Sequence, residues 1–343
     1  MDNNKKIVFS GVQPSGHLHI GNYLGAISQW VDMQDKYNCI FCVVDYHAIT
    51  VKQDPKVLKD KIIEAAKIYM AAGINPEKSV IFQQSDISAH TELTWILNCT
   101  SARISDLNKM TQFKDKVNCI AREGVLGHKA GSSQENVGVG LYDYPILMAA
   151  DILLYNTDAV PVGDDQTQHV ELSRTLARRF NSSFGEVFKV PELKIRKEGA
   201  RIMALDDPTK KMSKSSLSES SFIALNDNPE NAAKKIMKAA TDSGSEIKYD
   251  EKKKPGISNL LTIYSLLSTQ SIKKLEAKYK NKGYGDFKKD LACVVKDFLI
   301  DFQKKYNKIS DREVSKILTK GAKKIKPIAD ETIRKVKEQI GIS

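Results

Sequence analysis

Short apolar runs alternate with helical patterns over the first two hundred residues of the chain. Four runs have the length and composition of buried strands: 7–11, 41–45, 79–83 and 158–163. One intervening helix is especially clear, because Asp54 and Pro55 are typical of a helix start and Gly73 of a helix end. Strands separated by helices form parallel sheets that are covered on both faces. We therefore predict an α/β domain with a Rossmann-like, doubly wound parallel sheet.

The pattern changes after about residue 219, where strand-like runs stop. Five helical patterns follow, several of them amphipathic: 231–240, 257–268, 271–280, 287–306 and 312–340. Pro327 is expected to interrupt or kink the last of these helices. We predict a Rossmann-like domain over residues 1–203, a loop over 204–218 and an all-helical domain over 219–343.

Positive charge is concentrated in the last quarter of the chain. The formal net charge is +11, yet residues 251–343 alone carry 23 Lys and Arg against 11 Asp and Glu. A localised basic region is expected for a protein that binds a polyanion. A solvated, lysine-rich helical surface would look the same, and charge alone does not separate the two interpretations.

Neither a membrane segment nor a metal-binding cysteine pattern is evident. No apolar stretch approaches the ~18 residues of a membrane span, and the N-terminus lacks the apolar region of a signal peptide, so we expect a cytoplasmic protein without a membrane partner. Cys39 and Cys42 form a CxxC within an apolar, strand-like run, without a second CxxC to complete a zinc site. We expect buried structural thiols and no tightly bound metal held by the protein.

A glycine-rich segment at 11–26, GVQPSGHLHIGNYLGA, follows the first predicted strand and leads into a helix. Its glycines allow a ligand to approach the backbone, and the N–H groups of a helix start bind anions. His19 and Asn22 add side-chain donors one helical turn apart. Such donors suit a triphosphate, although a glycine-rich turn with incidental histidines is the alternative. The chain has neither the GxxxxGK[ST] of a P-loop nor a GxGxxG after a strand.

Two further segments carry polar groups that suit a nucleotide. PTKKMSKSS (208–216) is basic and rich in hydroxyl groups, so it can close over phosphates, although a Lys/Ser run by itself is more often a solvated loop. GDDQ (163–166) follows the fourth predicted strand, at the strand end where ligands bind in such sheets.

HIGN at 19–22 and KMSKS at 211–215 together resemble the two motifs of class I aminoacyl-tRNA synthetases. HIGN departs from the family's HIGH by Asn22, and GDDQ resembles the GxDQ of the tryptophanyl and tyrosyl enzymes. YPILMAADILLYNTDAVPVG (144–163) is similar to the tryptophanyl family, since tyrosyl enzymes typically have Gln where Met148 stands. The likeness extends over nearly the whole chain except 117–140, which holds five glycines and is expected to be a long loop.

The resemblance implies an activity. It implies a ligase that activates L-tryptophan with ATP and Mg²⁺, forms tryptophanyl-adenylate and pyrophosphate, and transfers tryptophan to the 3′ end of tRNA(Trp). The loop over 204–218 would be the KMSKS loop, and the helical domain would bind the tRNA anticodon. A homodimer is expected from the same resemblance.

The resemblance also implies site residues. The catalytic residues would be His19, Asn22, Lys211 and Lys214. ATP would contact Gln13, Pro14, Ser15, Gly21, Asn22, Gly163, Asp164, Asp165, Ile202, Lys211, Met212, Ser213, Lys214 and Ser215. Tryptophan would contact Phe9, His47, Tyr144, Met148, Asp151, Val160, Val162 and Gln166, with Asp151 accepting a hydrogen bond from the indole N–H.

Three alternatives stay open at this point. A tyrosyl-tRNA synthetase would share the fold and chemistry, and Met148 argues against it. A nucleotidyltransferase of the same superfamily that never meets tRNA would not need a basic helical tail. An inactive, synthetase-like RNA-binding protein would not need intact HIGN and KMSKS motifs.

Overall fold

The computed structural model describes residues 2, 4–14, 18–110, 138–162, 166–195, 201–212 and 218–342, with only the backbone described at 162, 194 and 195. Most of the long loop expected at 117–140 therefore lies outside the described residues. None of the helices in the described ranges is both long enough and apolar enough to cross a membrane.

Five parallel strands form the central sheet in the order β3-β2-β1-β4-β5. They are β1 (Ile7–Val12), β2 (Asn38–Val43), β3 (Val80–Gln83), β4 (Ala159–Val162) and β5 (Glu192–Ile195). Phe9 lies opposite Ile40 on β2, and Val8 lies opposite Ala159 on β4. The chain thus proceeds outward from β1 in one direction and then in the other, which is the doubly wound arrangement that we predicted. The first four strands overlap the four apolar runs, although β2 begins at Asn38 and ends at Val43, before the end of the run predicted at 41–45. The strand β5 was not predicted.

Helices cover both faces of this sheet, and the sheet separates two hydrophobic clusters, one on each face. The first cluster includes α2 (Ser28–Met33) and α4 (Pro55–Ala71), and the second includes α5 (Ala89–Thr100), α8 (Val139–Leu153) and α9 (Thr167–Phe184). Short helical elements complete this part of the chain: α1 (Ile20–Asn22), the π-helix η1 (Tyr23–Ile27), α3 (Asp45–Ala48), the 3₁₀-helix η2 (Gln84–Asp86), α6 (Ile104–Leu107) and the 3₁₀-helix η6 (Glu219–Ser221).

The two cysteines of the CxxC lie on opposite faces of the sheet. Side chains alternate along a strand, so Cys39 packs in the first cluster and Cys42 in the second. Both thiols are free and buried, as predicted, and burial raises the pKa of Cys39 to about 12. Two side chains on opposite faces of one strand cannot bind a common metal ion.

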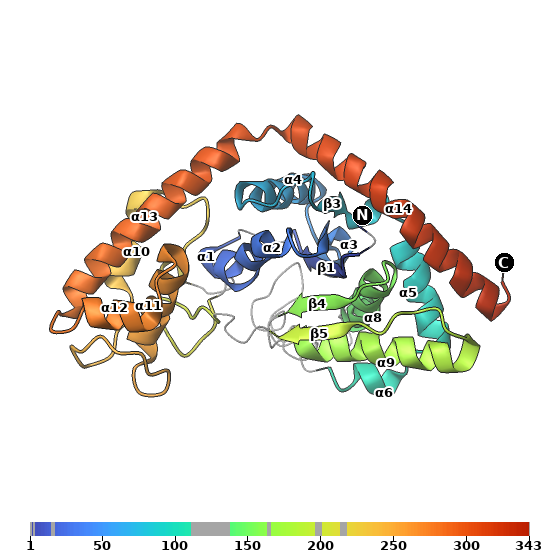
Figure 1. Cartoon of the computed structure of the whole chain (residues 1–343), viewed down its shortest axis with the longest axis horizontal. Helices are drawn as coiled ribbons and strands as arrows, with labels where there is room; N and C mark the ends of the chain where they lie inside the picture. Colours follow the sequence, from blue (N-terminus) through green and yellow to red (C-terminus); the bar gives the residue numbers. More distant parts are fainter. Residues whose placement is uncertain are drawn as a thin grey trace.

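Four helices extend the first cluster beyond the sheet and form what we call the helical module: α10 (Pro229–Lys238), α11 (Pro255–Ser268), α12 (Ile272–Lys278) and α13 (Tyr284–Lys308). Figure 1 shows the module at one end of the sheet. Tyr23 of η1 contacts Phe298 and Phe302 of α13, with ring centroids 4.8 and 6.2 Å apart. The module therefore shares a continuous hydrophobic core with one face of the sheet. The domain boundaries at 203 and 219 stay a prediction.

The helix α14 (Asp311–Ile340) leaves the module and runs along the outer side of the sheet, over α4, β3 and α5 (Figure 1). Val314 and Leu318 belong to the first cluster, and residues from Ala322 onward belong to the second. The Thr332 hydroxyl donates a hydrogen bond of 2.8 Å to the carbonyl of Leu154. This helix joins both cores and covers the edge strand β3.

We expected Pro327 to interrupt or kink α14, and the structure shows that it does not interrupt the helix. The helix is continuous from Asp311 to Ile340 with Pro327 inside it. A proline removes one intrahelical hydrogen bond. Ile325 and Ala329, on either side of Pro327, are completely buried against the sheet, and this packing stabilises the helix across the missing bond.

The contact between α14 and β3 predicts that Gly321 tolerates no side chain. A Cβ atom at this position would lie 1.9 Å from the carbonyl oxygen of Ile81. The backbone of β3 cannot move away from this clash as the end of a flexible side chain could. Gly→Ala inside a helix normally stabilises by ~1 kcal/mol. We expect Gly321→Ala instead to lower the free energy of unfolding by about 1–3 kcal/mol, measured by urea denaturation.

Gly285→Ala is the matched control for this experiment. Gly285 is also helical, in α13, and a Cβ atom there would meet nothing within 4 Å. Its replacement should leave stability unchanged or slightly increased. If Gly321→Ala behaved like this control, the close approach of α14 to β3 would be wrong.

Candidate functional site

The candidate site lies at the carboxyl ends of the strands, where β1 and β4 are neighbours and the chain reverses its direction across the sheet. Ligands bind at this position in doubly wound sheets. Gln13 and Pro14 follow β1, and His47 lies on α3, just after β2. The Gln13 side-chain amide donates a 2.7 Å hydrogen bond to the carbonyl of His47, which joins the ends of β1 and β2.

Asp151 lies in the interior of this site, on α8, with only 1% of its surface exposed. Its Oδ2 accepts a hydrogen bond of 2.8 Å from His47 Nε2. Its Oδ1 lies 2.6 Å from both the Gln84 side-chain amide and His90 Nδ1. Burial alone would raise the pKa of Asp151, but the hydrogen bonds from His47 and His90 outweigh it and hold this pKa well below its usual range. The site therefore contains an ionised carboxylate that can only accept hydrogen bonds.

Aromatic and apolar side chains of β1, β4 and α8 belong to the same hydrophobic cluster as Ala150 and Ile152, the residues on either side of Asp151. Phe9 and Val160 are buried on the adjacent strands β1 and β4, and Phe9 stacks on Tyr155 with ring centroids 5.8 Å apart. Met148 is half-buried on α8 and packs against the second cluster. An ionised acceptor close to buried aromatic and aliphatic groups suits a flat, apolar ligand that carries one N–H donor.

Tyr144 lies one helical turn before Met148 on α8. Its ring meets that of His47 edge-on, with centroids 6.2 Å apart, and its hydroxyl lies 2.9 Å from Nε2 of the buried His169. Burial raises the pKa of Tyr144 to about 12, so its hydroxyl keeps its hydrogen at neutral pH. Gln166 lies at the N-cap position of α9, one turn before His169.

The HIGN segment forms the start of a helix, as expected. His19 is buried at the N-cap of α1, and its backbone N–H donates a 3.0 Å hydrogen bond to Asn22 Oδ1. A Cβ atom on Gly21 would lie 2.9 Å from His19 Nδ1 and 3.3 Å from Met212 Sδ. Gly21 therefore allows both side chains to lie directly against the helix backbone.

The segments on both sides of the KMSKS loop are held against this helix start. The Met212 N–H donates to the carbonyl of Ile202 at 2.9 Å, and both residues are buried, whereas Lys211 is exposed. After the loop, residues 223–225 pair antiparallel with residues 18–20, through Ile20 N–H to Ile223 O at 2.9 Å and Leu225 N–H to Leu18 O at 3.0 Å. Two motifs almost 190 residues apart thus meet.

Several residues of the sequence prediction lie outside the described residues. They are Ser15, Gly163, Asp164, Asp165, Ser213, Lys214 and Ser215, together with the side chain of Val162. Most of the other predicted residues fall into two groups. Phe9, Gln13, His47, Tyr144, Met148, Asp151 and Val160 lie on the elements around the carboxylate, and His19, Gly21, Asn22, Ile202 and Met212 lie around the start of α1. Pro14 follows β1, Gln166 begins α9, and Lys211 is exposed beside Met212.

Sequence analysis missed four residues of the Asp151 neighbourhood: Gln84, His90, Tyr155 and His169. Gln84 and His90 follow β3, a strand that we predicted, and parallel strands end at the same edge of the sheet. Polar residues after 79–83 were therefore a usable signal. Tyr155 and His169 resemble ordinary core residues of their helical segments, and no local pattern marks them.

Comparison with known proteins identifies the family. Residues 1–300 match the family model described as "tRNA synthetases class I (W and Y)". The chain is 53% identical over 337 residues to the tryptophan–tRNA ligase of Caldanaerobacter subterraneus subsp. tengcongensis, with 98% of each chain covered. It is 51% identical over 339 residues to that of Helicobacter pylori, with 99% of each covered.

Solved structures agree with this assignment. The tryptophanyl-tRNA synthetase of Mycoplasma pneumoniae superposes with a TM-score of 0.91 at 35% identity, covering 99% of this chain and 98% of that one. The Campylobacter jejuni enzyme, described as complexed with ADP and tryptophan, superposes with a TM-score of 0.78 at 37% identity, covering 98% and 99%. The chain belongs to the tryptophanyl-tRNA synthetases, within the class I family of tryptophan and tyrosine enzymes.

Proposed function

We propose that the two groups of site residues bind the two small substrates of a tryptophan–tRNA ligase, tryptophan around Asp151 and ATP around the start of α1. The observation that carries this proposal is the buried, ionised Asp151 beside aromatic residues, next to a helix start that contacts the KMSKS flank. The Campylobacter relative, described with ADP and tryptophan bound, supports an adenine nucleotide and tryptophan as the two ligands.

Tryptophan would enter the Asp151 pocket with its indole N–H toward the carboxylate. Phe9, Met148, Val160 and Val162 would contact the ring, while Tyr144 and Gln166 would bind the amino group. His47 would complete the pocket, since it already donates to Asp151 Oδ2. A carboxylate that only accepts hydrogen bonds favours a ligand with a donor at this point, and a smaller amino acid without that donor would leave it unpaired, so no second, editing site is needed.

ATP would bind across the start of α1 and the KMSKS flank. Asn22 Oδ1 is engaged by the His19 N–H, so the amide Nδ2 is the group that would donate to a phosphate. Gly21 lies against Met212, whose backbone N–H is bonded to Ile202, and Gln13, Pro14 and residues 163–165 would complete the nucleotide site. The absence of a Cβ on Gly21 permits close approach of the nucleotide.

The first reaction needs no nucleophile from the protein. The tryptophan carboxylate attacks the α-phosphorus of ATP, an O–P bond forms, and the bond to the β-phosphate oxygen breaks to release pyrophosphate. His19, Asn22, Lys211 and Lys214 would stabilise the negative charge that develops on the phosphorus and the pyrophosphate, and Mg²⁺ would arrive on the ATP phosphates. In the second step the 3′ hydroxyl of tRNA(Trp) attacks the adenylate carbonyl, and AMP leaves.

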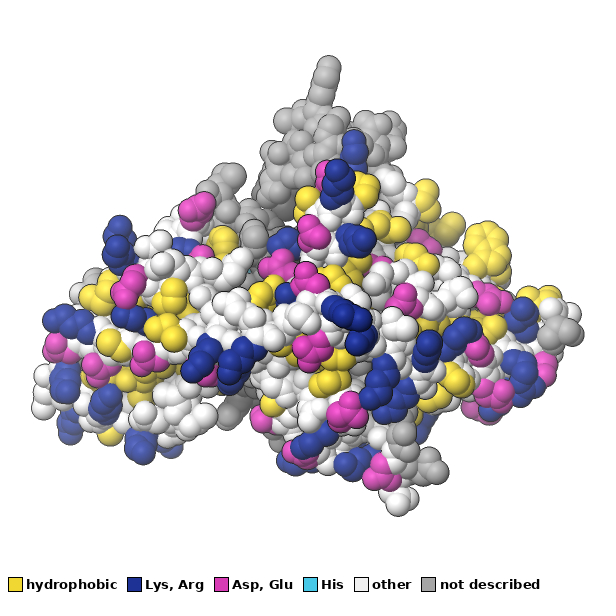
Figure 2. All heavy atoms as spheres, turned by 90° about the horizontal axis from the view of Figure 1, so that it is seen from above, with side chains coloured by type: hydrophobic (Ala, Val, Ile, Leu, Met, Phe, Trp, Pro, Cys, Tyr) yellow, Lys and Arg dark blue, Asp and Glu magenta, His cyan; other side chains and the backbone are white. Residues whose placement is uncertain are grey.

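The basic residues of the C-terminal quarter differ in how they are paired. On α14 five of the nine cations have carboxylate partners among the described residues: Lys320 with Glu77, Lys326 with Asp330, Arg334 with Glu331 and Glu338, Lys335 with Glu331, and Lys337 with Glu92. Figure 2 shows Lys, Arg, Asp and Glu side chains interspersed over this face. The α14 surface is thus closer to the solvated-surface interpretation than to a polyanion site.

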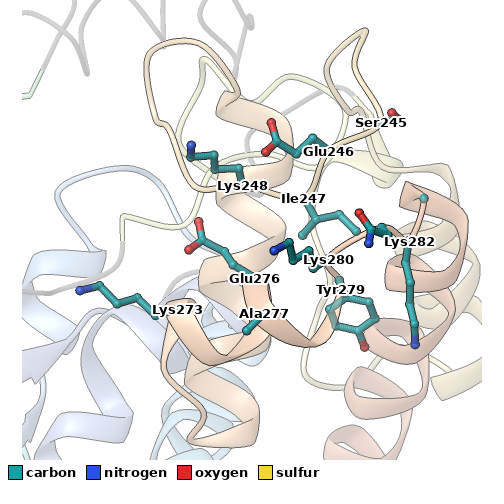
Figure 3. A pocket seen from close by; sticks show the side chains of 12 residues that line it. Ser245, Glu246, Ile247, Lys248, Lys273, Glu276, Ala277, Tyr279, Lys280 and Lys282 are labelled. Carbon is teal, nitrogen blue, oxygen red and sulfur yellow. The ribbon is translucent and has the colours of Figure 1, made fainter.

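A pocket in the helical module offers a better site for tRNA. It has a volume of about 680 Å³ and lies between residues 245–248 and the segment 273–283 (Figure 3). Ile247 and Tyr279 are its buried apolar lining, so we expect the pocket to bind tRNA through its charged rim.

Four lysines surround this pocket: Lys248, Lys273, Lys280 and Lys282. All four are exposed, and none of them forms an ion pair with another described residue. The two carboxylates of the lining are engaged elsewhere, Glu246 with Lys254 and Glu276 with the N–H of Tyr249. Lys282 lies over the Tyr279 ring, 5.5 Å from its centroid, so Lys248, Lys273 and Lys280 are the ammonium groups that would bind phosphates of tRNA(Trp).

Formation of a homodimer also stays a proposal. Large apolar side chains are exposed on three helices that pack together: Trp95 on α5, Ile104 on α6 and Val139 on α8, with exposed fractions of 71%, 74% and 80%. Exposed apolar groups of this size on neighbouring elements are typical of a protein interface. A second copy of the chain would bury them.

Asp151→Asn tests the tryptophan pocket. The Asn side chain has one acceptor oxygen where the carboxylate has two. The indole N–H and the donors that already bind Asp151 would therefore compete for that one oxygen. We expect kcat/KM for tryptophan in ATP–pyrophosphate exchange to fall about 10- to 150-fold, as for loss of a hydrogen bond to a charged group. Asp143→Asn, on the same helix with its carboxylate bound to Asn98, should keep the wild-type value. An unchanged KM and kcat for tryptophan in Asp151→Asn would exclude the contact.

Lys211→Ala tests the pyrophosphate contact. Loss of one charged donor to the leaving group should lower kcat of exchange by about 10²–10³ with little change in the KM of tryptophan. The neighbouring Lys210 is ion-paired with Asp207 at 2.8 Å, so Lys210→Ala should lower kcat far less. Equal effects of the two substitutions would show that position 211 has no special role.

Lys273→Ala/Lys280→Ala tests the tRNA surface without truncating the chain, which would remove the α14 part of the core. We expect a higher KM for tRNA(Trp) and a log–log salt dependence that is shallower by roughly 0.7–0.9 per lost phosphate contact, with pyrophosphate exchange unchanged. Lys320→Ala/Lys326→Ala, on α14, is the matched control. The pocket would be excluded if both double variants showed the wild-type salt dependence.

A further inference from the structure

Three donors already surround Asp151, and they restrict how it can bind a ligand. A carboxylate oxygen has two acceptor positions. Oδ1 uses both, for the Gln84 amide and His90 Nδ1, each at 2.6 Å. Oδ2 uses one, for His47 Nε2 at 2.8 Å. One acceptor position is left, on Oδ2, and its direction depends on how the other three are held.

Gln84 is held in a single orientation. Its Oε1 accepts a 3.0 Å hydrogen bond from the backbone N–H of Tyr46, so its Nε2 must be the atom that faces Asp151. Gln84 is completely buried, and it lies in η2 at the end of β3. The donor on this side is thus fixed by the ends of β2 and β3.

His90 is held from both sides of its ring. It is completely buried near the start of α5, its Nδ1 faces Asp151, and its Nε2 lies 2.7 Å from the Tyr155 hydroxyl. Because the ionised Asp151 only accepts, Nδ1 must carry a hydrogen. Burial holds the pKa of Tyr155 well above its usual range, so this hydroxyl keeps its own hydrogen and can donate to Nε2. Phe82 stacks on the imidazole ring with centroids 5.9 Å apart.

Tyr155 connects this network to the aromatic side of the pocket. Its completely buried ring stacks on Phe9, which the proposed function places against the indole. Tyr155, His90 and Asp151 therefore form one continuous hydrogen-bonded chain that ends at the position where the indole N–H is expected.

We propose that His90 is a positioning residue for tryptophan selection: through its bond to Oδ1 it directs the remaining acceptor position of Asp151 Oδ2 toward the indole N–H, and Tyr155 fixes the His90 ring. This inference rests on the proposed role of Asp151. His90 itself contacts no substrate, so its effect should be on discrimination between ligands with and without the N–H, rather than on all ligands equally.

The experiment compares tryptophan with β-(1-benzothiophen-3-yl)alanine, in which sulfur replaces the indole N–H. The measured quantity is kcat/KM for tryptophan divided by kcat/KM for the analogue, in ATP–pyrophosphate exchange by the full-length enzyme. We call this quotient the discrimination ratio. Loss of packing around the pocket lowers both kcat/KM values together and leaves the ratio unchanged. Misdirection of the acceptor lowers only the value for tryptophan.

Two isosteric variants separate the two sides of the His90 ring. In His90→Asn the side-chain amide replaces Nδ1 and keeps a donor toward Asp151; in His90→Gln the amide replaces Nε2 and faces Tyr155 instead. We expect His90→Gln to lower the discrimination ratio about tenfold and His90→Asn to leave it at the wild-type value. A wild-type ratio in folded His90→Gln, or an equal loss in both variants, would overturn the proposal.

Tyr155→Phe keeps the experiment decisive if His90→Gln does not fold. It retains the ring that stacks on Phe9 and removes only the hydroxyl that fixes His90. A discrimination ratio lowered about threefold would support the proposal, and a wild-type ratio would overturn it.

Asp151→Asn distinguishes failure of this inference from failure of the proposed function. If this variant discriminates as the wild type does, or if the wild type itself does not discriminate, Asp151 does not accept the indole N–H and both proposals fall. If Asp151→Asn loses discrimination while His90→Gln retains it, the role of Asp151 stands and only the role of His90 is overturned.

Discussion

A charged carboxylate out of contact with water must be surrounded by hydrogen-bond donors, and the end of the sheet is arranged around this requirement. Asp151 comes from α8, whereas its donors come from α3, η2 and α5, which follow β2 and β3. Removing one partner of a buried charge typically costs about 3–5 kcal/mol, so these elements are strongly coupled to one another. The same bonds that stabilise the buried charge also determine which acceptor position remains for a ligand.

The second constraint is the close contact between the two motif segments. Residues 18–20 and 223–225 pair as short antiparallel segments, and the missing side chain of Gly21 allows His19 and Met212 to approach the helix start. Both sides of the KMSKS loop are thereby attached to buried structure.

Local patterns were sufficient for most elements and insufficient for contacts between distant ones. The first four strands are continuous apolar runs and were predicted, but β5 (ELKI) carries two charged residues among four and gives no such pattern. The helix α14 was predicted from its amphipathic period, although that period does not say that its first turns pack in one core and its later turns in another. Asp151 was identified through family resemblance, whereas Gln84 and His90 become neighbours only through the order of the strands. The roles of the site residues, including those that lie outside the described ranges, stay predictions.

The position of α14 along β3 also has a consequence for the order in which the chain is synthesised. Residues 80–83 emerge from the ribosome more than 200 residues before 311–340, the segment that covers them. At about 5–20 residues per second, the outer edge of β3 stays uncovered for roughly 10–45 s. An open strand edge can pair with another chain during that time, so the nascent protein passes through an aggregation-prone stage that the finished protein no longer has.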